Sequence, residues 1–173
     1  MTEISVQDLA LHPFTAFGKD WMALGAGNEQ DGCNFMTIAW GHLGSIWGRK
    51  DSPISLPTTV CFVRPSRYTK EFMDKEARFT ICHFPAEYRK ALGYIGSHSG
   101  RNGDKLAAAG LTPVFADGTA YLDEADLVLI CRKLYVGELS EQGFVDKTLV
   151  DGNYPERDFH TMYIGEVIKV LKK

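Results

Sequence analysis

Residues 61–69 read Cys-Phe-Val-Arg-Pro-Ser-Arg-Tyr-Thr, and the predicted fold is built outward from them. Residues 61–63 are apolar and typical of a short β-strand. Pro65 ends that strand because proline has no backbone N–H for a sheet. A helix is predicted to follow, with Ser66 as its N-cap and an apolar stripe formed by Tyr68, Phe72 and Met73.

Arg64, Arg67 and Thr69 therefore lie where a strand end meets the start of a helix. The first turn of a helix offers free N–H groups and a partial positive charge, and guanidinium groups add planar donors. This combination is suited to a phosphate group. A surface turn with two solvated arginines is the alternative interpretation of the same residues.

Length and composition favour one globular domain spanning residues 1–173. The chain is 45% hydrophobic and has a net charge of −3, which disfavours a general nucleic-acid-binding protein. No signal-peptide pattern and no apolar run of the length that spans a bilayer occur. The four cysteines form no Cys-x-x-Cys and the histidines have no metal-ligand spacing. We expect a cytoplasmic protein with free thiols and no metal, nucleic-acid or membrane partner.

Residues 34–40 are predicted to form a strand with two different faces. A period of two places Asn34, Met36, Ile38 and Trp40 on one face, and Phe35, Thr37 and Ala39 on the other. The first face is apolar but carries hydrogen-bonding groups, as ligand sites often do. A strand lying beneath a loop would have the same pattern.

The remaining pattern predicts mostly strands. Strands are expected at residues 21–27, 78–84, 127–136 and 160–171, helices at 86–95 and 104–109, a long connection at 41–57 and a polar excursion at 138–155. Asn102 is expected to cap the second helix, and Asp117-Gly118 to form a hairpin turn. Many short strands with few inserted helices indicate a mainly β fold, an antiparallel barrel with helical excursions.

Residues 96–105 form a loop with three glycines and two cationic side chains. Glycines let successive N–H groups approach an anion, although the spacing matches neither a P-loop nor a dinucleotide motif. A solvated loop is the alternative.

Four motifs occur in a characteristic order: Asn34-x-Met-Thr-x-x-Trp40, Arg64-Pro-x-Arg-Tyr-Thr69, Gly96-Ser-x-Ser-Gly-Arg-x-x-Asp-Lys105 and His160-x-x-x-x-Gly-Glu-Val167. Together they span roughly residues 20–171. The chain resembles the flavin reductase-like proteins, which are FMN-binding split barrels, and is most similar to their flavoredoxin branch. The resemblance implies a six-stranded antiparallel Greek-key split barrel and a homodimer with one FMN per subunit near the interface.

The resemblance also implies roles for individual residues. Around the isoalloxazine ring and ribityl chain it places Asn34, Met36, Thr37 and Trp40. At the phosphate and ribityl chain it places Arg64, Arg67, Tyr68 and Thr69, with Ser99, Arg101 and Lys105 approaching from the second loop. Strict alternation turns Thr37 away from its group, so a bulge or a main-chain contact would be needed.

The implied chemistry is that of the flavin, which takes a hydride from a nicotinamide and passes electrons on. His160 is the one candidate catalytic residue. Many flavin reductases have Gly-Asp-His here, whereas this chain has Arg157-Asp-Phe-His160, with the aspartate displaced by one position. A partly buried structural histidine is the alternative.

Three functions remain open at this point. One is an NAD(P)H-dependent flavin or small-acceptor oxidoreductase. The second is a flavoredoxin-like electron-transfer protein that receives electrons from a protein donor. The third is a non-redox flavin-binding or storage protein.

Overall fold

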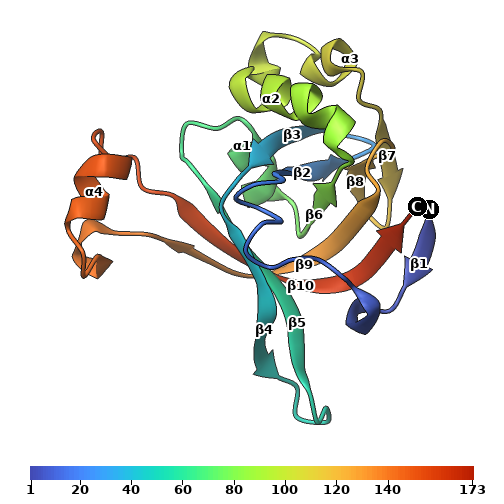
Figure 1. Ribbon diagram of the computed structural model, residues 1–173, viewed down its shortest axis with the longest axis horizontal. Helices are drawn as coiled ribbons and strands as arrows, with labels where there is room; N and C mark the ends of the chain where they lie inside the picture. The colour runs from blue at the N-terminus through green and yellow to red at the C-terminus, as the bar shows by residue number, and fades with distance from the viewer.

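The computed structural model describes residues 1–173 and contains one eight-stranded antiparallel sheet and a separate two-stranded hairpin (Figure 1). The strands are β1 (Thr2–Ile4), β2 (Met22–Asn28), β3 (Gly32–Ile38), β4 (Gly41–Gly48), β5 (Ser55–Val63), β6 (Arg78–His83), β7 (Pro113–Ala116), β8 (Thr119–Leu122), β9 (Leu127–Glu138) and β10 (Thr161–Lys172). The helices are α1 (Thr69–Lys75), α2 (Arg89–Ser97), α3 (Lys105–Ala109) and α4 (Thr148–Asn153).

The large sheet curls back on itself. Its order is β3-β2-β6-β9-β10-β5-β4, with β1 added to one end of β10. The two outermost strands, β3 and β4, are joined by Ala39 and Trp40 alone. Two residues span only a few ångströms, so the edges of the sheet must lie close together where that link passes between them. The result is a barrel that is split between β3 and β4.

This arrangement confirms the predicted fold class, a mainly β split barrel, with more strands than the six expected. The additional strands are short or lie at the edges. Strand β1 pairs only with the last residues of β10, and β7 pairs only with β8. The predicted turn at Asp117-Gly118 joins β7 to β8, and both residues have positive φ (51° and 68°), as a two-residue hairpin turn requires.

Two apolar clusters lie on the two faces of the sheet. The first fills the barrel and includes Met36 and Ile38. The second includes Phe35 and joins the sheet to α2 through Leu92 and Ile95. Alternation along β3 therefore sends neighbouring side chains into different cores. Figure 1 shows α2 and α3 together at one end of the barrel.

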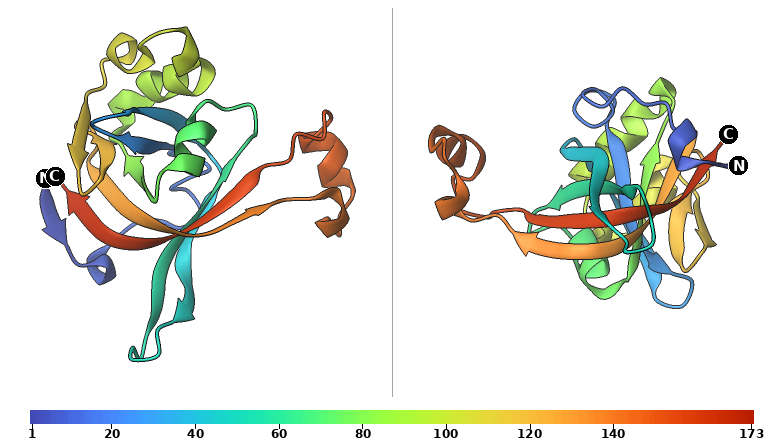
Figure 2. Two further views of the ribbon diagram at one scale, coloured as in Figure 1. Left: turned by 180° about the vertical axis from the view of Figure 1, so that it is seen from behind. Right: turned by 90° about the horizontal axis from the view of Figure 1, so that it is seen from below.

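Two arms extend from the barrel in Figure 1 and in the left view of Figure 2. One is the β4–β5 hairpin, so the prediction of a long connection at 41–57 was wrong. Glycines and prolines suggested a loop there, but Gly48 lies at a bulge in the β4–β5 pairing and Pro57 is accommodated within β5. The other arm joins β9 to β10 and carries α4, a helix that the sequence pattern did not predict.

The β4–β5 arm is tied to the barrel by a buried carboxylate. Glu166 in β10 accepts hydrogen bonds from Arg49, just beyond β4, at 2.7 and 2.8 Å, and from Arg132 in β9 at 2.5 and 3.2 Å. Burial of a carboxylate is tolerated when charged donors satisfy it in this way.

Two predicted helix caps were wrong. Ser66 does not cap α1, which follows Tyr68 in helical conformation without a side-chain cap. Asn102 does not cap α3 either, because the carboxylate of Asp104 accepts hydrogen bonds from the N–H groups of Leu106 (3.1 Å) and Ala107 (3.0 Å). Both errors arise because the chain turns once more before each helix begins. None of the helices has the length and hydrophobicity needed to cross a bilayer.

Candidate functional site

A cavity of about 210 Å³ lies at the split of the barrel. Its lining residues come from β3 and the link that follows it, from the end of β5 and the turn before α1, and from the residue before β10. The lining consists of Met36, Thr37, Ile38, Ala39, Trp40, Phe62, Arg64, Arg67 and His160. The tertiary structure thus brings residues of three sequence motifs to one place.

The fourth motif packs against β3 and α1 beside this cavity. Asn34 is buried, and its Nδ2 donates a hydrogen bond of 2.7 Å to Oγ1 of Thr69 at the start of α1. Gly100 lies against that amide so closely that an added Cβ would overlap Asn34 Oδ1 and approach Tyr68 Cδ1 to 3.1 Å. The glycine is needed here for close approach rather than for backbone freedom.

Two of the predicted phosphate-binding arginines have carboxylate partners. Arg64 pairs with Asp158 at 2.5 Å and also donates to the carbonyl of Asn153 at 2.7 Å. Arg101 pairs with Glu71 and lies over the Tyr68 ring at 4.7 Å. Their positive charges are therefore largely compensated within the chain.

Arg67 and Lys105 have no carboxylate partner. Arg67 donates one hydrogen bond of 3.3 Å, to the carbonyl of Gly96. Lys105 is buried, and its Nζ donates to the carbonyls of Ile95 (2.9 Å) and His98 (3.1 Å). Burial, together with the positive charge of Arg67, lowers the pKa of Lys105 to about 8. Two uncompensated cations that repel each other favour binding of an anion between them.

The other predicted residues surround the same region. Thr37 donates a hydrogen bond of 2.5 Å to the carbonyl of Leu92, so its side chain faces α2 as strict alternation requires, and β3 contains no bulge. Met36 packs into the barrel core. Ser99 accepts a hydrogen bond of 3.3 Å from the N–H of Arg101. The flavin contacts of these residues remain predictions.

Trp40 and His160 form the aromatic side of the cavity. Trp40 follows the end of β3, and its side chain is partly exposed. Its ring centroid lies 4.9 Å from that of His160, which is buried. Tyr154 Oη lies 2.9 Å from His160 Nδ1. Burial lowers the pKa of His160 to about 4, with a further contribution from the charge of Arg64, so the imidazole is neutral at pH 7.

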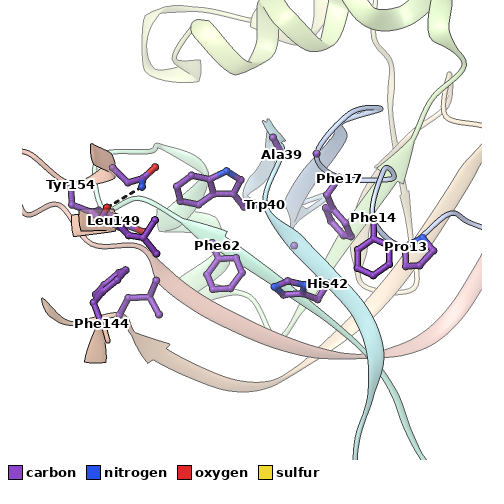
Figure 3. Close-up of a pocket in the computed structure, with 14 residues that line it drawn as sticks. Pro13, Phe14, Phe17, Ala39, Trp40, His42, Phe62, Phe144, Leu149 and Tyr154 are labelled. Atoms are coloured by element: carbon purple, nitrogen blue, oxygen red, sulfur yellow. Dashed lines mark hydrogen bonds between the residues drawn. The ribbon is translucent and has the colours of Figure 1, made fainter. Parts of the chain in front are cut away.

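A larger apolar groove shares Ala39, Trp40 and Phe62 with this cavity (Figure 3). Its volume is about 440 Å³. Apart from Trp40, sequence reasoning missed its residues, because Phe14 and Phe17 lie in a segment without periodicity and Phe144 and Tyr154 lie in the polar excursion. The recurrence of aromatic residues at 144, 154 and 159 was the available signal.

Acid is expected to destabilise the protein through His160. The unfolded imidazole titrates near 6.5 and the folded one near 4, so the unfolded chain binds a proton first. Stability is therefore complete above pH 6.5 and falls as the pH is lowered toward 4. We expect His160 to account for about 2 kcal/mol of the loss between pH 7.5 and 4.5.

Urea unfolding of the wild type and of His160→Gln at the two pH values measures this contribution. The variant should lose less stability than the wild type on acidification. An equal loss in both proteins would show that His160 titrates normally.

Comparison with known proteins identifies the fold. Residues 52–172, more than half of the chain, match the model of the flavin reductase like domain. The chain belongs to the flavin reductase-like family. The matched region includes the turn at Arg64 and Arg67, the Gly100 loop and His160, while Asn34 and Trp40 precede it.

Solved structures show the same split-barrel fold at low sequence identity. Flavoredoxin from Methanosarcina acetivorans superimposes with a TM-score of 0.66 at 18% identity, covering 100% of this chain and 76% of its own. An FMN-binding protein from Thermus thermophilus, solved with bound 1-cyclohex-2-enone, gives 0.64 at 21% identity, with coverages of 99% and 80%. An NADH:FAD oxidoreductase from Streptomyces globisporus gives 0.63 at 17% identity, with coverages of 89% and 75%.

The comparison with curated proteins returned no match. Membership of the flavin reductase-like family supports a flavin-binding redox function, either as an oxidoreductase or in electron transfer.

Proposed function

We propose that the protein binds FMN at the barrel split and acts as an NAD(P)H-dependent flavin or small-acceptor oxidoreductase. The observation that carries the proposal is the pair of uncompensated cations, Arg67 and Lys105, beside a cavity bounded by Trp40. A phosphate between the cations and a flat ring against the indole match the two ends of FMN. When bound, FMN supplies the hydride and electron chemistry.

The chain's own residues bind and orient the cofactor. The proposed phosphate contacts are Arg67, Lys105, Ser99 and Thr69, with Arg64, Arg101 and Tyr68 forming the rest of that end. Asn34, Met36, Thr37 and Trp40 border the ring and ribityl chain. Gly96 lets α2 pack closely against β3 beside this region, since an added Cβ would lie 3.1 Å from Thr37 Cβ. Several charge-assisted hydrogen bonds of about 1.5–3 kcal/mol each, with burial of a flat ring, are enough for binding in the micromolar range.

The proposed partner is a second copy of this chain. The two arms expose apolar side chains that belong to neither core cluster, namely Ile46, Trp47, Ile54, Val145 and Leu149. Exposed apolar groups on extended arms are typical of surfaces that pack against another protein. A homodimer formed through the arms would cover them.

A flavoredoxin-like electron carrier is the second candidate. Asp158, the residue displaced from the Gly-Asp-His pattern, pairs with Arg64 and does not hydrogen-bond to His160. This departure weakens the case for direct nicotinamide use. Both a flavoredoxin and an NADH:FAD oxidoreductase share the fold, so the fold is compatible with either function.

The visible absorption spectrum of the freshly purified protein tests the cofactor. We expect a yellow protein that releases FMN on heating, identified by mass, and a sedimentation mass of two chains. A colourless protein that also fails to bind added FMN would contradict the proposal. Anaerobic mixing with NADH or NADPH then separates the functions: rapid bleaching supports the oxidoreductase, and bleaching only by dithionite or a protein donor supports the carrier.

A further inference from the structure

Tyr154 and His160 form a buried pair that the proposed flavin contacts do not explain. Tyr154 directly follows α4, at the base of the second arm, and His160 directly precedes β10. Both side chains are buried, and Tyr154 Oη lies 2.9 Å from His160 Nδ1. The pair lies where the small cavity meets the apolar groove, since His160 lines the first and Tyr154 lines the second. Figure 3 shows Tyr154 in the groove.

Surrounding groups fix the tyrosine ring. Arg64 lies over its face at 5.2 Å, and the Phe144 and Phe159 rings pack beside it with centroids at 5.8 and 4.8 Å. Arg64 is itself held by Asp158 and by the carbonyl of Asn153. The hydroxyl group therefore has little freedom to leave the imidazole.

The available hydrogen-bond partners indicate which of the two groups, the Tyr154 hydroxyl or His160 Nδ1, is the donor. The Tyr154 hydroxyl has no other partner in the protein, so donation to His160 Nδ1 is the arrangement that satisfies its proton within the protein. The reverse direction would leave that buried proton without an acceptor, at a cost of about 1–3 kcal/mol. Burial raises the pKa of Tyr154, which keeps the hydroxyl protonated.

An acceptor role for Nδ1 places the imidazole proton on Nε2. Nε2 makes no hydrogen bond within the protein. Nε2 is also not fully buried. The fully buried side-chain polar atoms without a hydrogen-bond partner are the hydroxyls of Thr119 and Thr161, and Nε2 of His160 is not among them. Because His160 lines the small cavity beside Trp40, we infer that Nε2–H reaches that cavity.

We propose that Tyr154 is a positioning residue that holds His160 in the neutral Nε2–H form, so that the imidazole donates a hydrogen bond to a carbonyl oxygen or ring nitrogen of the molecule bound in the cavity. This inference deepens the proposed function and, for the identity of that molecule, rests on it. It excludes a role for His160 as a general base at neutral pH, because its one free lone pair is used by Tyr154. The charged groups nearby are Arg64, Asp158 and Arg67.

The first test needs no flavin. ¹⁵N NMR of the ligand-free protein at pH 7, with His160 assigned by its loss in His160→Gln, should show Nδ1 unprotonated and Nε2 protonated. In Tyr154→Phe the two nitrogen signals should move toward each other, because no group then selects one tautomer. Tyr88→Phe, which removes a hydroxyl without a hydrogen bond, should leave them unchanged. A protonated Nδ1 in the wild type, or an unchanged spectrum in Tyr154→Phe, would overturn the proposal.

The second test uses FMN titration. Tyr154→Phe should bind FMN about twofold to tenfold more weakly, the size of one misaligned neutral hydrogen bond, and shift the visible band of the bound flavin. Unchanged affinity and spectrum in a protein that binds FMN would overturn the donor role. If the wild type binds no FMN, the proposed function fails, while the tautomer is still decided by NMR.

Discussion

Arg67→Gln is expected to weaken FMN binding by about 10-fold to 100-fold while leaving riboflavin binding nearly unchanged. Arg67 carries a positive charge with no carboxylate partner and makes only one hydrogen bond, of 3.3 Å, to Gly96. Loss of one charge-assisted contact to a phosphate costs about 1.5–3 kcal/mol, and tenfold in affinity corresponds to about 1.4 kcal/mol. Riboflavin lacks the phosphate, so its affinity should be nearly the same for the variant and the wild type.

Titration of both ligands, followed by flavin fluorescence, measures the difference. Arg78→Gln is the matched control because it removes the same charge from a side chain that bonds the carbonyl of Asp117 and does not line the cavity. Equal losses for FMN and riboflavin in Arg67→Gln would show that the residue does not bind phosphate. Equal losses of FMN affinity in the two variants would indicate a general effect of net charge.

Lys105 is a less suitable residue for this test. Its ammonium group holds two carbonyl groups at the end of α2, so Lys105→Ala would alter the loop as well as remove the charge. Arg67 has fewer contacts within the protein and isolates the electrostatic contribution.

Gly100→Ala is expected to lower FMN affinity at least 10-fold and to destabilise the fold by about 1–3 kcal/mol. The new methyl group would overlap Asn34 Oδ1 and crowd Tyr68. Neither neighbour can move freely, because Asn34 is buried and bonded to Thr69, while Tyr68 packs edge-on against Phe72 at 5.2 Å. The loop that carries Ser99 and Lys105 would therefore shift away from α1.

Gly93→Ala is the matched control. Gly93 lies in α2 with open space around its Cα, so alanine should stabilise the helix by up to about 1 kcal/mol and leave flavin binding unchanged. Urea unfolding and FMN titration of both variants give the comparison. In an Asn34→Ala background, Gly100→Ala should destabilise the fold less, since the overlapping amide is gone. A full cost in that background would contradict the steric explanation.

Local patterns in the sequence predicted most of the elements. The strands near residues 21–27, 78–84 and 127–136 and the helices α1, α2 and α3 were found because their periodicity is strong and glycine or proline marks their ends. Only the end of β5 at residues 61–63 was predicted of the β4–β5 hairpin, because residues 41–57 contain few β-branched residues and most of β4 is exposed. Helix α4 was missed because six residues in a polar segment give too short a pattern.

The candidate site was also predicted only in part. Basic residues at a strand–helix junction and in a glycine-rich loop indicated an anion site, and the order of four motifs indicated the flavin reductase-like family. The pairing of each cation was not predictable. Arg64 and Asp158, separated by 94 positions in the chain, meet only because β5 and β10 are neighbours in the sheet.

The sequence by itself determined the fold class, the family and several of the residues that line the cavity at the barrel split, because these depend on local periodicity and motif order. Only the tertiary structure decided which cations lack a carboxylate partner and which hydroxyl group faces His160. Those properties depend on distances between segments far apart in the chain, and electrostatic energy and hydrogen bonding change steeply with distance.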